Sequence, residues 1–230
     1  MNFSTATTTF LAKWMLQAVA VVTLLSPVAG QTAEVCDAAG TSGARSCKAG
    51  LTTAQIQNIV AIQEKSQWCW AASIAMIFAH YGFTLPQERI VRQHFGDTAD
   101  RPVAAGAITD LLDRSWKDAQ GRPFMVTATV ADAPDTRPRP ALNTMVTELA
   151  GDRPLVIGVT GHAMVLVRVE YDRLPTGELR ITGGTVIDPT PGKGLRRLTS
   201  QESRPTYLAA VHVLEAQSVA SAHVAPAAAL

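Results

Sequence analysis

The chain has 230 residues, and 47% of them are hydrophobic, which is enough to bury a sizeable core. Twenty basic and nineteen acidic residues give a formal net charge of +1, and no run of lysine or arginine stands out. This balance argues against a protein that binds nucleic acid or anionic lipid.

The first thirty residues have the pattern of a targeting segment. Lys13 precedes the apolar stretch WMLQAVAVVTLLSPVAG, which Pro27 interrupts, and Val28 and Gly30 suit the positions before a cleavage site. The pattern predicts a secretory signal peptide over residues 1–30, cleaved near Gly30, and hence a secreted or periplasmic protein. The alternative is a membrane anchor, but a bilayer span needs about 20 uninterrupted apolar residues and this stretch is shorter. We therefore expect no stable membrane insertion.

Three cysteines are present, so one must be left over if the others pair in an oxidising compartment. Cys36 and Cys47 lie in a Gly/Ala/Ser-rich segment without periodic pattern, residues 31–50, which we expect to be flexible. A disulfide between them would contribute up to about 3 kcal/mol by the chain-entropy estimate. Cys69 would then be the free thiol. Because the cysteines form no repeated close-spaced pair, the sequence predicts no structural zinc site.

The first half of the chain has mainly helical patterns. Residues 68–81, WCWAASIAMIFAHY, are apolar on nearly all sides and stop before Gly82, which is typical of a buried helix with a glycine at its end. We interpret this segment as the central helix. A short helix or extended segment precedes it and two amphipathic helices follow it; their sequences are TTAQIQNIVAI, PQERIVRQHFG and AAGAITDLLDRSW.

From residue 123 the pattern changes to that of strands. PFMVTATV, residues 123–130, alternates, and a proline-rich linker and the helix ALNTMVTELAG separate it from four further strand-like segments. These segments are PLVIGVT, HAMVLVRVEY, ELRITGGTVI and TYLAAVHVLEA. The order predicts an α+β fold in which a helical N-terminal lobe packs against a C-terminal antiparallel β-sheet lobe. This domain would span residues 51–216, and residues 217–230 would form a disordered tail.

Cys69 lies at the start of the central helix. There the unpaired backbone N–H groups and the positive end of the helix dipole favour the thiolate over the thiol. A cysteine in an apolar helix is more often a small buried hydrophobe, so a nucleophilic role requires a base nearby.

Among the five histidines, His162 is the best candidate for that base. It follows Thr160 and Gly161 at the start of a strand, where a side chain can project into a cleft. His80 is on the same helix as Cys69 but about 16 Å along it, which is too far to reach the sulfur. The remaining three are expected in ordinary roles, on a charged helix, in a strand and in the tail: His94, His212 and His223.

Asp188 is the candidate partner of the histidine. If the second and third C-terminal strands form a hairpin centred on Pro175, opposed residue numbers sum to about 350, which pairs Asp188 with His162. A bulge at Gly183 or Gly184 would shift this register by one residue. The carboxylate could then hold the imidazole in one orientation. Taken alone, an aspartate before a proline more often starts a turn.

Acyl transfer also needs hydrogen-bond donors for the developing oxyanion. Gln63 precedes Cys69 by six residues, so its side-chain amide can come beside the sulfur, and the Cys69 backbone N–H would be the second donor. Gln67 competes for this role. The spacing alone is not specific, and an ordinary polar residue before a helix is the commoner reading of both glutamines.

Together, QEKSQWCWAAS, GHAMVL and VIDPTPG resemble the papain-like cysteine peptidases, in particular the compact bacterial branch with secreted plant-pathogen effector proteases and the peptidase domains of bacteriocin exporters. The family pattern is a glutamine six residues before a Cys-Trp pair, a histidine opening a strand, and an Asp or Asn ending the next strand. The matching residues, within 57–192, are Gln63, Cys69 with Trp70, His162 and Asp188. Papain's glycine-rich surroundings of the nucleophile are absent and an aspartate replaces its asparagine, so papain's substrate subsites do not transfer.

The resemblance implies a secreted cysteine peptidase in which a thiolate–imidazolium pair of Cys69 and His162 attacks a peptide carbonyl and forms a thioester. Asp188 would orient the imidazole, and Gln63 would help to stabilise the oxyanion. The partner would be a peptide or protein substrate, and no metal or organic cofactor is required. Two alternatives stay open: an amidase, peptidoglycan endopeptidase or transglutaminase on the same scaffold, and a catalytically inactive binding module.

Overall fold

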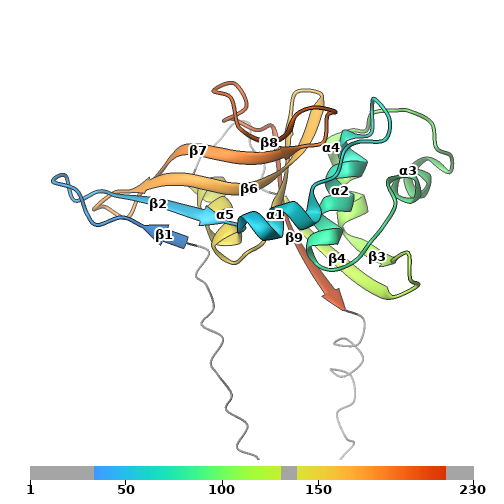
Figure 1. Ribbon diagram of the computed structural model, residues 1–230, viewed down its shortest axis with the longest axis horizontal. Helices are drawn as coiled ribbons and strands as arrows, with labels where there is room; N and C mark the ends of the chain where they lie inside the picture. The colour runs from blue at the N-terminus through green and yellow to red at the C-terminus, as the bar shows by residue number, and fades with distance from the viewer. Residues whose placement is uncertain (1–33, 131–138, 216–230) are drawn as a thin grey trace, which may run out of the picture. The chain divides into compact units, whose positions relative to one another are not determined.

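A computed structural model describes residues 34–130 and 139–215 of the chain (Figure 1). The expected signal peptide at residues 1–30 and the expected tail at residues 217–230 lie outside the described residues. Within the described ranges, the helices are too short or too polar to span a bilayer. Most helices come before most strands, which confirms the α+β order that the sequence predicted.

The central helix is α2, Cys69–His80. It is buried on nearly all sides, as its apolar, alanine-rich sequence predicted: Ile74, Met76 and Phe78 have no exposed surface. The helix Gln87–Phe95, α3, ends at Gly96, whose φ of 76° places it in the left-handed region that favours glycine. The other helices in the described residues are α1 (Thr53–Ile59), α3 (Gln87–Phe95), α4 (Ala105–Leu112) and α5 (Arg139–Ala150).

The strands of the described residues form one nine-stranded antiparallel sheet. Its main order is β1-β2-β6-β5-β9-β4-β3, and β7 pairs with both β6 and β8. β6 pairs with β2 and β5 in turn along one edge and with β7 along the other, and Figure 1 shows β6 and β7 as a long pair. The strands are β1 (Glu34–Cys36), β2 (Arg45–Gly50), β3 (Arg114–Lys117), β4 (Pro123–Val130), β5 (Leu155–Val159), β6 (His162–Arg173), β7 (Leu179–Asp188), β8 (Gly194–Arg197) and β9 (Tyr207–Glu215).

Helices and sheet share one apolar core. α2 packs against β5 and β6, and α5 packs against β2, β6 and β9. Phe78 of α2 meets Phe124 of β4 edge to face, with ring centroids 5.2 Å apart, and Phe83 stacks on the same ring at 4.2 Å. The helical part is therefore fixed against the sheet, which sets where the start of α2 lies relative to β6.

The expectation of a flexible segment over residues 31–50 is wrong for β1 and β2. β2 pairs with β6 from Arg45 opposite Arg173 to Gly50 opposite Arg168, so it extends the sheet. Its inward-facing residues, Cys47 and Ala49, are each 2% exposed. Both are small, so their alternation with Ser46 and Lys48 gives only a weak strand pattern in the sequence. The sheet thus begins before residue 51, the expected start of the domain.

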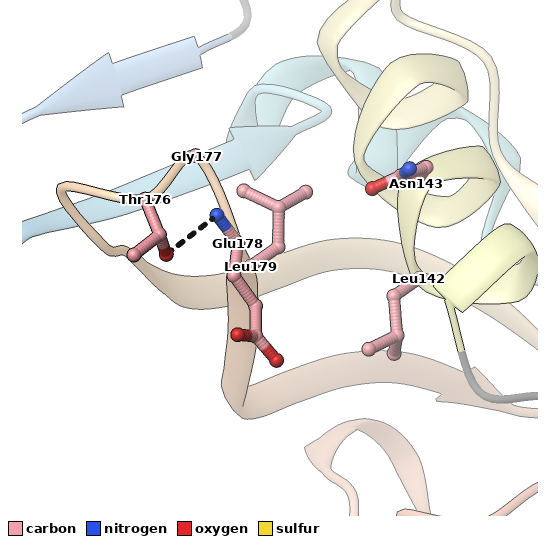
Figure 2. A pocket seen from close by; sticks show the side chains of 6 residues that line it. All are labelled: Leu142, Asn143, Thr176, Gly177, Glu178 and Leu179. Carbon is pink, nitrogen blue, oxygen red and sulfur yellow. Dashed lines mark hydrogen bonds between the residues drawn. The ribbon is translucent and has the colours of Figure 1, made fainter.

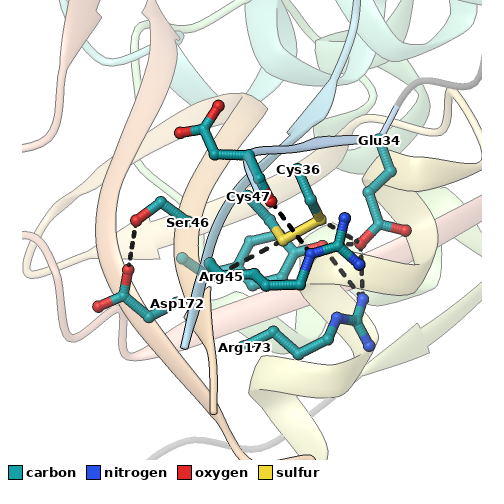
Figure 3. Close-up of a disulfide and its surroundings, with 9 residues drawn as sticks. Glu34, Cys36, Arg45, Ser46, Cys47, Asp172 and Arg173 are labelled. Carbon is teal, nitrogen blue, oxygen red and sulfur yellow. Dashed lines mark hydrogen bonds and ion pairs between the residues drawn. A yellow bond between two sulfur atoms is a disulfide. The ribbon is translucent and has the colours of Figure 1, made fainter. Parts of the chain in front are cut away.

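Cys36 and Cys47 form a disulfide, as proposed from the cysteine count. They are direct partners in the β1–β2 ladder, and Figure 3 shows the bridge with Glu34 and Arg173 beside it. The Arg173 guanidinium bonds the Glu34 carboxylate at 2.6 Å, and the Tyr171 hydroxyl donates to the same carboxylate. The disulfide and this polar group attach β1 to the sheet.

Two boundaries differ from the sequence prediction. The helix expected through AAGAITDLLDRSW stops at Leu112, and Arg114 to Lys117 form β3 instead. The Trp116 indole donates to the Leu111 carbonyl at 3.0 Å, which helps to close this sharp change of direction. β8 follows the turn DPTPGKG and was not predicted, because only four residues form it.

Candidate active site

Two buried tryptophans fix the surroundings of Cys69. Trp68 and Trp70 are 1% and 2% exposed. Their indole N–H groups donate to the carbonyls of Ala99 at 3.1 Å and Arg101 at 3.2 Å, so each buried polar atom is satisfied. The rings on both sides of the cysteine therefore attach the start of α2 to the loop that follows α3.

The loop before Cys69 is held by the same neighbour. Asp100 accepts the backbone N–H of Gln67 and the hydroxyl of Ser66, both at 2.7 Å. These bonds, that from Ser66 most, lower the pKa of Asp100. Gln67, the competing oxyanion donor, is exposed, and its backbone takes part in this anchoring. The bonds to Asp100 therefore fix the path of residues 66–67 into the start of α2.

Cys69 is the first residue of α2 and, within the described chain, the free cysteine. Burial raises the pKa of its thiol, but hydrogen bonds with the His162 side chain and the Ala163 N–H outweigh burial. The charge of His162 and the Trp70 N–H act in the same direction, and the pKa of Cys69 lies below its ordinary value of 9.0. The thiolate is thus stabilised by groups from β6 and from its own helix.

His162, the first residue of β6, connects the sulfur to Asp188. Its Nε2 lies 2.8 Å from Asp188 Oδ1, which leaves Nδ1 as the ring nitrogen for Cys69. The hydrogen bond with Cys69 raises the pKa of His162 most, burial lowers it, and Asp188 raises it again, so the pKa lies above 6.5. A lowered pKa of the thiol together with a raised pKa of the imidazole is typical of a pair in which the thiolate and the imidazolium stabilise each other.

The contact between His162 and Asp188 occurs in a register other than the predicted one. Val165 pairs with Ile187, so Asp188 continues the ladder opposite Met164 rather than His162. Two positions along one strand face the same side of the sheet, so the carboxylate reaches the imidazole diagonally. The predicted neighbours are brought together although the predicted pairing is wrong.

Asp188 is 4% exposed and ends β7. Burial raises its pKa, but hydrogen bonds from the Thr190 backbone, from Arg196 and from His162 lower it to about 2. The Thr190 N–H lies 3.0 Å from Oδ1, and Arg196 Nε lies 2.9 Å from Oδ2. Both oxygens are therefore in use, and the carboxylate is ionised throughout the neutral range.

Gln63 lies in a segment that is clamped from two sides. Its backbone N–H donates to the Pro189 carbonyl at 2.8 Å, next to Asp188. Gln87, 5% exposed at the start of α3, donates to the Ile62 carbonyl at 2.8 Å and accepts the Glu64 N–H at 3.1 Å. Gln87 thus fixes the residues on both sides of Gln63. Sequence reasoning did not single out Gln87.

The side-chain amide of Gln63 is engaged by its own loop. Nε2 donates to the carbonyls of Lys65 at 2.9 Å and Ser66 at 2.7 Å. Oε1 is buried and has no hydrogen-bond partner. Gln63 therefore lies in the loop that leads to Cys69, and the two N–H groups of its side chain are bound to backbone acceptors of that loop.

The other histidines have partners of their own. His80 Nε2 lies 2.7 Å from the Asp152 carbonyl oxygen, and His212 Nε2 lies 3.0 Å from the Glu148 carboxylate. The His94 ring meets the edge of Trp70 at 6.3 Å. These contacts agree with the structural roles expected from the sequence, and His223 lies outside the described residues.

A separate hollow lies between α5 and the turn that joins β6 to β7 (Figure 2). Its volume is about 290 Å³. Leu142 and Asn143 line it from the helix, and Thr176 to Leu179 line it from the turn. None of the four predicted site residues lines it, so the hollow is not the place where the thiol chemistry is arranged.

Comparison with known proteins places these residues in a family. Residues 51–202 match the family model described as papain-like cysteine protease AvrRpt2. Among solved structures, the chain is similar to a double glycine motif protease from an AMS/PCAT transporter in complex with the leader peptide: 20% identity over 66% of this chain and 89% of that one, TM-score 0.40. It is also similar to the peptidase domain of Streptococcus ComA, a bi-functional ABC transporter involved in a quorum-sensing pathway: 18% identity, 69% and 98% coverage, TM-score 0.42. No curated protein matches the chain.

Proposed function

The chain belongs to the papain-like cysteine protease AvrRpt2 family and is a cysteine-type peptidase, and we propose that Cys69, His162 and Asp188 are its catalytic triad. The observation that carries the proposal is the connected series of contacts from the sulfur through the imidazole to a buried carboxylate. It combines a nucleophile, a base within hydrogen-bond reach and a group that orients the base.

In the proposed reaction the Cys69 thiolate attacks the carbonyl carbon of a peptide bond. The C–N bond breaks as His162 gives its proton to the leaving amine, and a thioester remains on the sulfur. The neutral imidazole then takes a proton from water as the water oxygen attacks the thioester carbonyl. The C–S bond breaks, the carboxylic acid leaves, and the Cys69 thiolate and the His162 imidazolium are restored. Asp188 holds the ring in place through Nε2 and stabilises the imidazolium in both steps.

The oxyanion formed in each step needs donors, and we assign this role to the Cys69 backbone N–H and to Gln63. The first N–H groups of a helix have no intrahelical acceptor, which supports the first assignment. The Gln63 amide is bound to two neutral carbonyls in the free protein. A charged oxygen is a stronger hydrogen-bond acceptor than a neutral carbonyl. One of these N–H groups would therefore leave its carbonyl and donate to the oxyanion when the oxyanion forms.

We propose that the substrate is a peptide or protein and that the enzyme is secreted or periplasmic. The disulfide between Cys36 and Cys47 supports the second statement, because such bonds persist in oxidising compartments and are rare in the cytosol. The chemistry as proposed uses side chains, one backbone N–H and water, and includes no metal or organic cofactor.

The test is hydrolysis of a mixed peptide library and of casein by the mature protein with its disulfide intact. Cys69→Ala and His162→Ala should each abolish cleavage, because nucleophile and base are both essential. His80→Ala is the control: its ring contacts a backbone carbonyl elsewhere, and cleavage should persist. Cleavage retained by Cys69→Ala would refute the triad. Release of ammonia or muropeptides, with peptides left intact, would favour an amidase, transglutaminase or peptidoglycan endopeptidase instead.

A further inference from the structure

Arg196 contacts the side of Asp188 that His162 does not occupy. It lies on β8 opposite Val186, and its Nε is 2.9 Å from Asp188 Oδ2. One of its terminal nitrogens, Nη2, also lies 2.8 Å from the same oxygen. Oδ1 is left to His162 and to the Thr190 N–H. The two carboxylate oxygens thus have different partners, and the guanidinium fixes which one faces the imidazole.

Glu202 holds the guanidinium from behind. Its carboxylate forms a two-point contact with Arg196, at 2.8 Å to Nη1 and 2.7 Å to Nη2. The Thr199 N–H donates to Glu202 at 2.8 Å, which fixes the carboxylate in turn. The side chains of Arg196 and Glu202 are 23% and 18% exposed, so solvent screens this pair less than it screens a surface pair.

We propose that Arg196, clamped by Glu202, is a positioning residue of the peptidase: it turns the Asp188 carboxylate so that Oδ1 faces His162, and it keeps that carboxylate ionised in acid. The inference rests on the proposed role of Asp188 in the triad. A carboxylate that is 4% exposed needs an opposite charge to remain ionised, and Arg196 supplies one that does not titrate in the working range.

The charges around Asp188 explain why a second acid is present. In the described residues, His162 faces it from β6 and Arg196 from β8; Cys69 of α2 lies behind the imidazole and Glu202 behind the guanidinium. Arg196 alone would oppose the positive charge on His162. Glu202 offsets this effect, so the carboxylate is held without destabilising the imidazolium.

Arg197 offers a matched control on the same strand. Its guanidinium makes a similar two-point contact with Glu170, at 2.9 and 2.5 Å, but its side chain is 62% exposed. Successive residues of a strand face opposite sides of the sheet, so Arg197 points away from Asp188. Arg197→Met and Arg196→Met therefore each remove one Arg–Glu pair from β8, and only the second removes a contact with the triad.

The readout is the rate of Cys69 alkylation by iodoacetamide as a function of pH, with the disulfide intact so that Cys69 is the thiol that reacts. In Arg196→Met, Asp188 becomes protonated at higher pH, the imidazolium loses its partner and the thiolate is lost with it. The acid limb should move upward by about one pH unit or more, which is about a tenfold slower reaction on the wild-type limb. Arg196→Lys keeps the charge without the planar fork and should restore part of the shift. Arg197→Met should follow the wild type.

Thermal melting separates positioning from folding, because a purely structural role lowers the melting temperature without moving the limb. If the acid limbs of the alkylation profile coincide in the wild type and Arg196→Met, the inference is overturned. If Arg196→Met does not fold, an acid limb of Arg196→Lys that coincides with the wild type would overturn it as well. The alkylation assay needs no substrate. The proposed function would be refuted if the wild type cleaves no peptide or if Cys69→Ala still cleaves. If the wild type is active and the acid limb does not move in the Arg196 variants, only the role of Arg196 is refuted.

Discussion

Replacing Gln87 by leucine should reduce catalysis through Gln63 without touching the triad. The change removes two hydrogen bonds, to the Ile62 carbonyl and from the Glu64 N–H, on either side of Gln63. A side-chain hydrogen bond contributes about 0.5–1.5 kcal/mol. Ile62 is 59% exposed, so water can replace part of what is lost, and we expect a destabilisation of about 1–2 kcal/mol.

If this free energy holds the segment in place, its loss lowers the ratio of correct to displaced geometry by about 5- to 30-fold. kcat should fall by up to this factor with little change in KM, because the proposed donor acts on the oxyanion and not on the bound substrate. Removing the donor itself, in Gln63→Ala, should cost about 10²–10³ in kcat. The assay is steady-state hydrolysis of a fluorogenic peptide from the active library, with urea denaturation of each variant.

A double-mutant cycle decides whether Gln87 acts through Gln63. In Gln63→Ala the position of the segment no longer matters to the oxyanion, so adding Gln87→Leu should lower kcat little further. Effects that multiply in the double variant would refute the argument. Gln93→Leu is the matched control: it makes the same substitution on the same helix at an exposed position, and should leave kcat unchanged.

Three further outcomes follow from the same contacts. The pKa of Asp188, about 2 against an ordinary 3.8, contributes about 2 kcal/mol of stability that is fully present above about pH 4 and is lost as the pH falls towards 2. In urea denaturation, the free energy of unfolding of Asp188→Asn should therefore decrease less than that of the wild type over this pH range. The kcat of Asp188→Asn should fall in part, because His162 is less well oriented. Asp100→Ala removes both bonds to the cysteine loop, so Cys69 alkylation should slow severalfold, and an unchanged rate would contradict the anchoring. Cys36→Ser should lower stability by up to about 3 kcal/mol in thermal denaturation, as should reduction of the wild type. The folded protein should keep its activity, because Cys47 pairs with Tyr171 towards the end of β6 that lies away from His162.

The sequence predicted which elements carry the candidate site residues better than it predicted how those elements pair. Cys69 and His162 each stand at the first position of an element, where local pattern is informative. The pairing of β6 and β7 is less local: one extra residue on β6 near Val167 and one on β7 near Thr182 offset each other. The register therefore recovers beyond the two irregularities, and the diagonal contact with Asp188 survives an incorrect count.

The residues that sequence reasoning missed act through contacts that no local pattern encodes. Gln87 begins an ordinary amphipathic helix, and only its burial against the Ile62 segment gives it a role. Arg196 belongs to a four-residue strand, and its bond to Asp188 exists because β8 returns beside the end of β7. Cys47 and Ala49 are small, so the buried face of β2 carried too little hydrophobic signal to separate a strand from a loop.

The candidate site consists of two separately anchored parts, which a backbone hydrogen bond connects. One part is the loop and start of α2, which Trp68 and Asp100 attach to the segment after α3. The other is the end of β7, whose carboxylate takes bonds from β6 and β8. The Gln63 N–H, bonded to the Pro189 carbonyl at 2.8 Å, links them one residue away from Asp188. Because this bond is between backbone atoms, the backbones that carry Gln63 and Asp188 keep their spacing when side chains rearrange around a substrate, so the proposed oxyanion donor has only its side-chain amide to redirect.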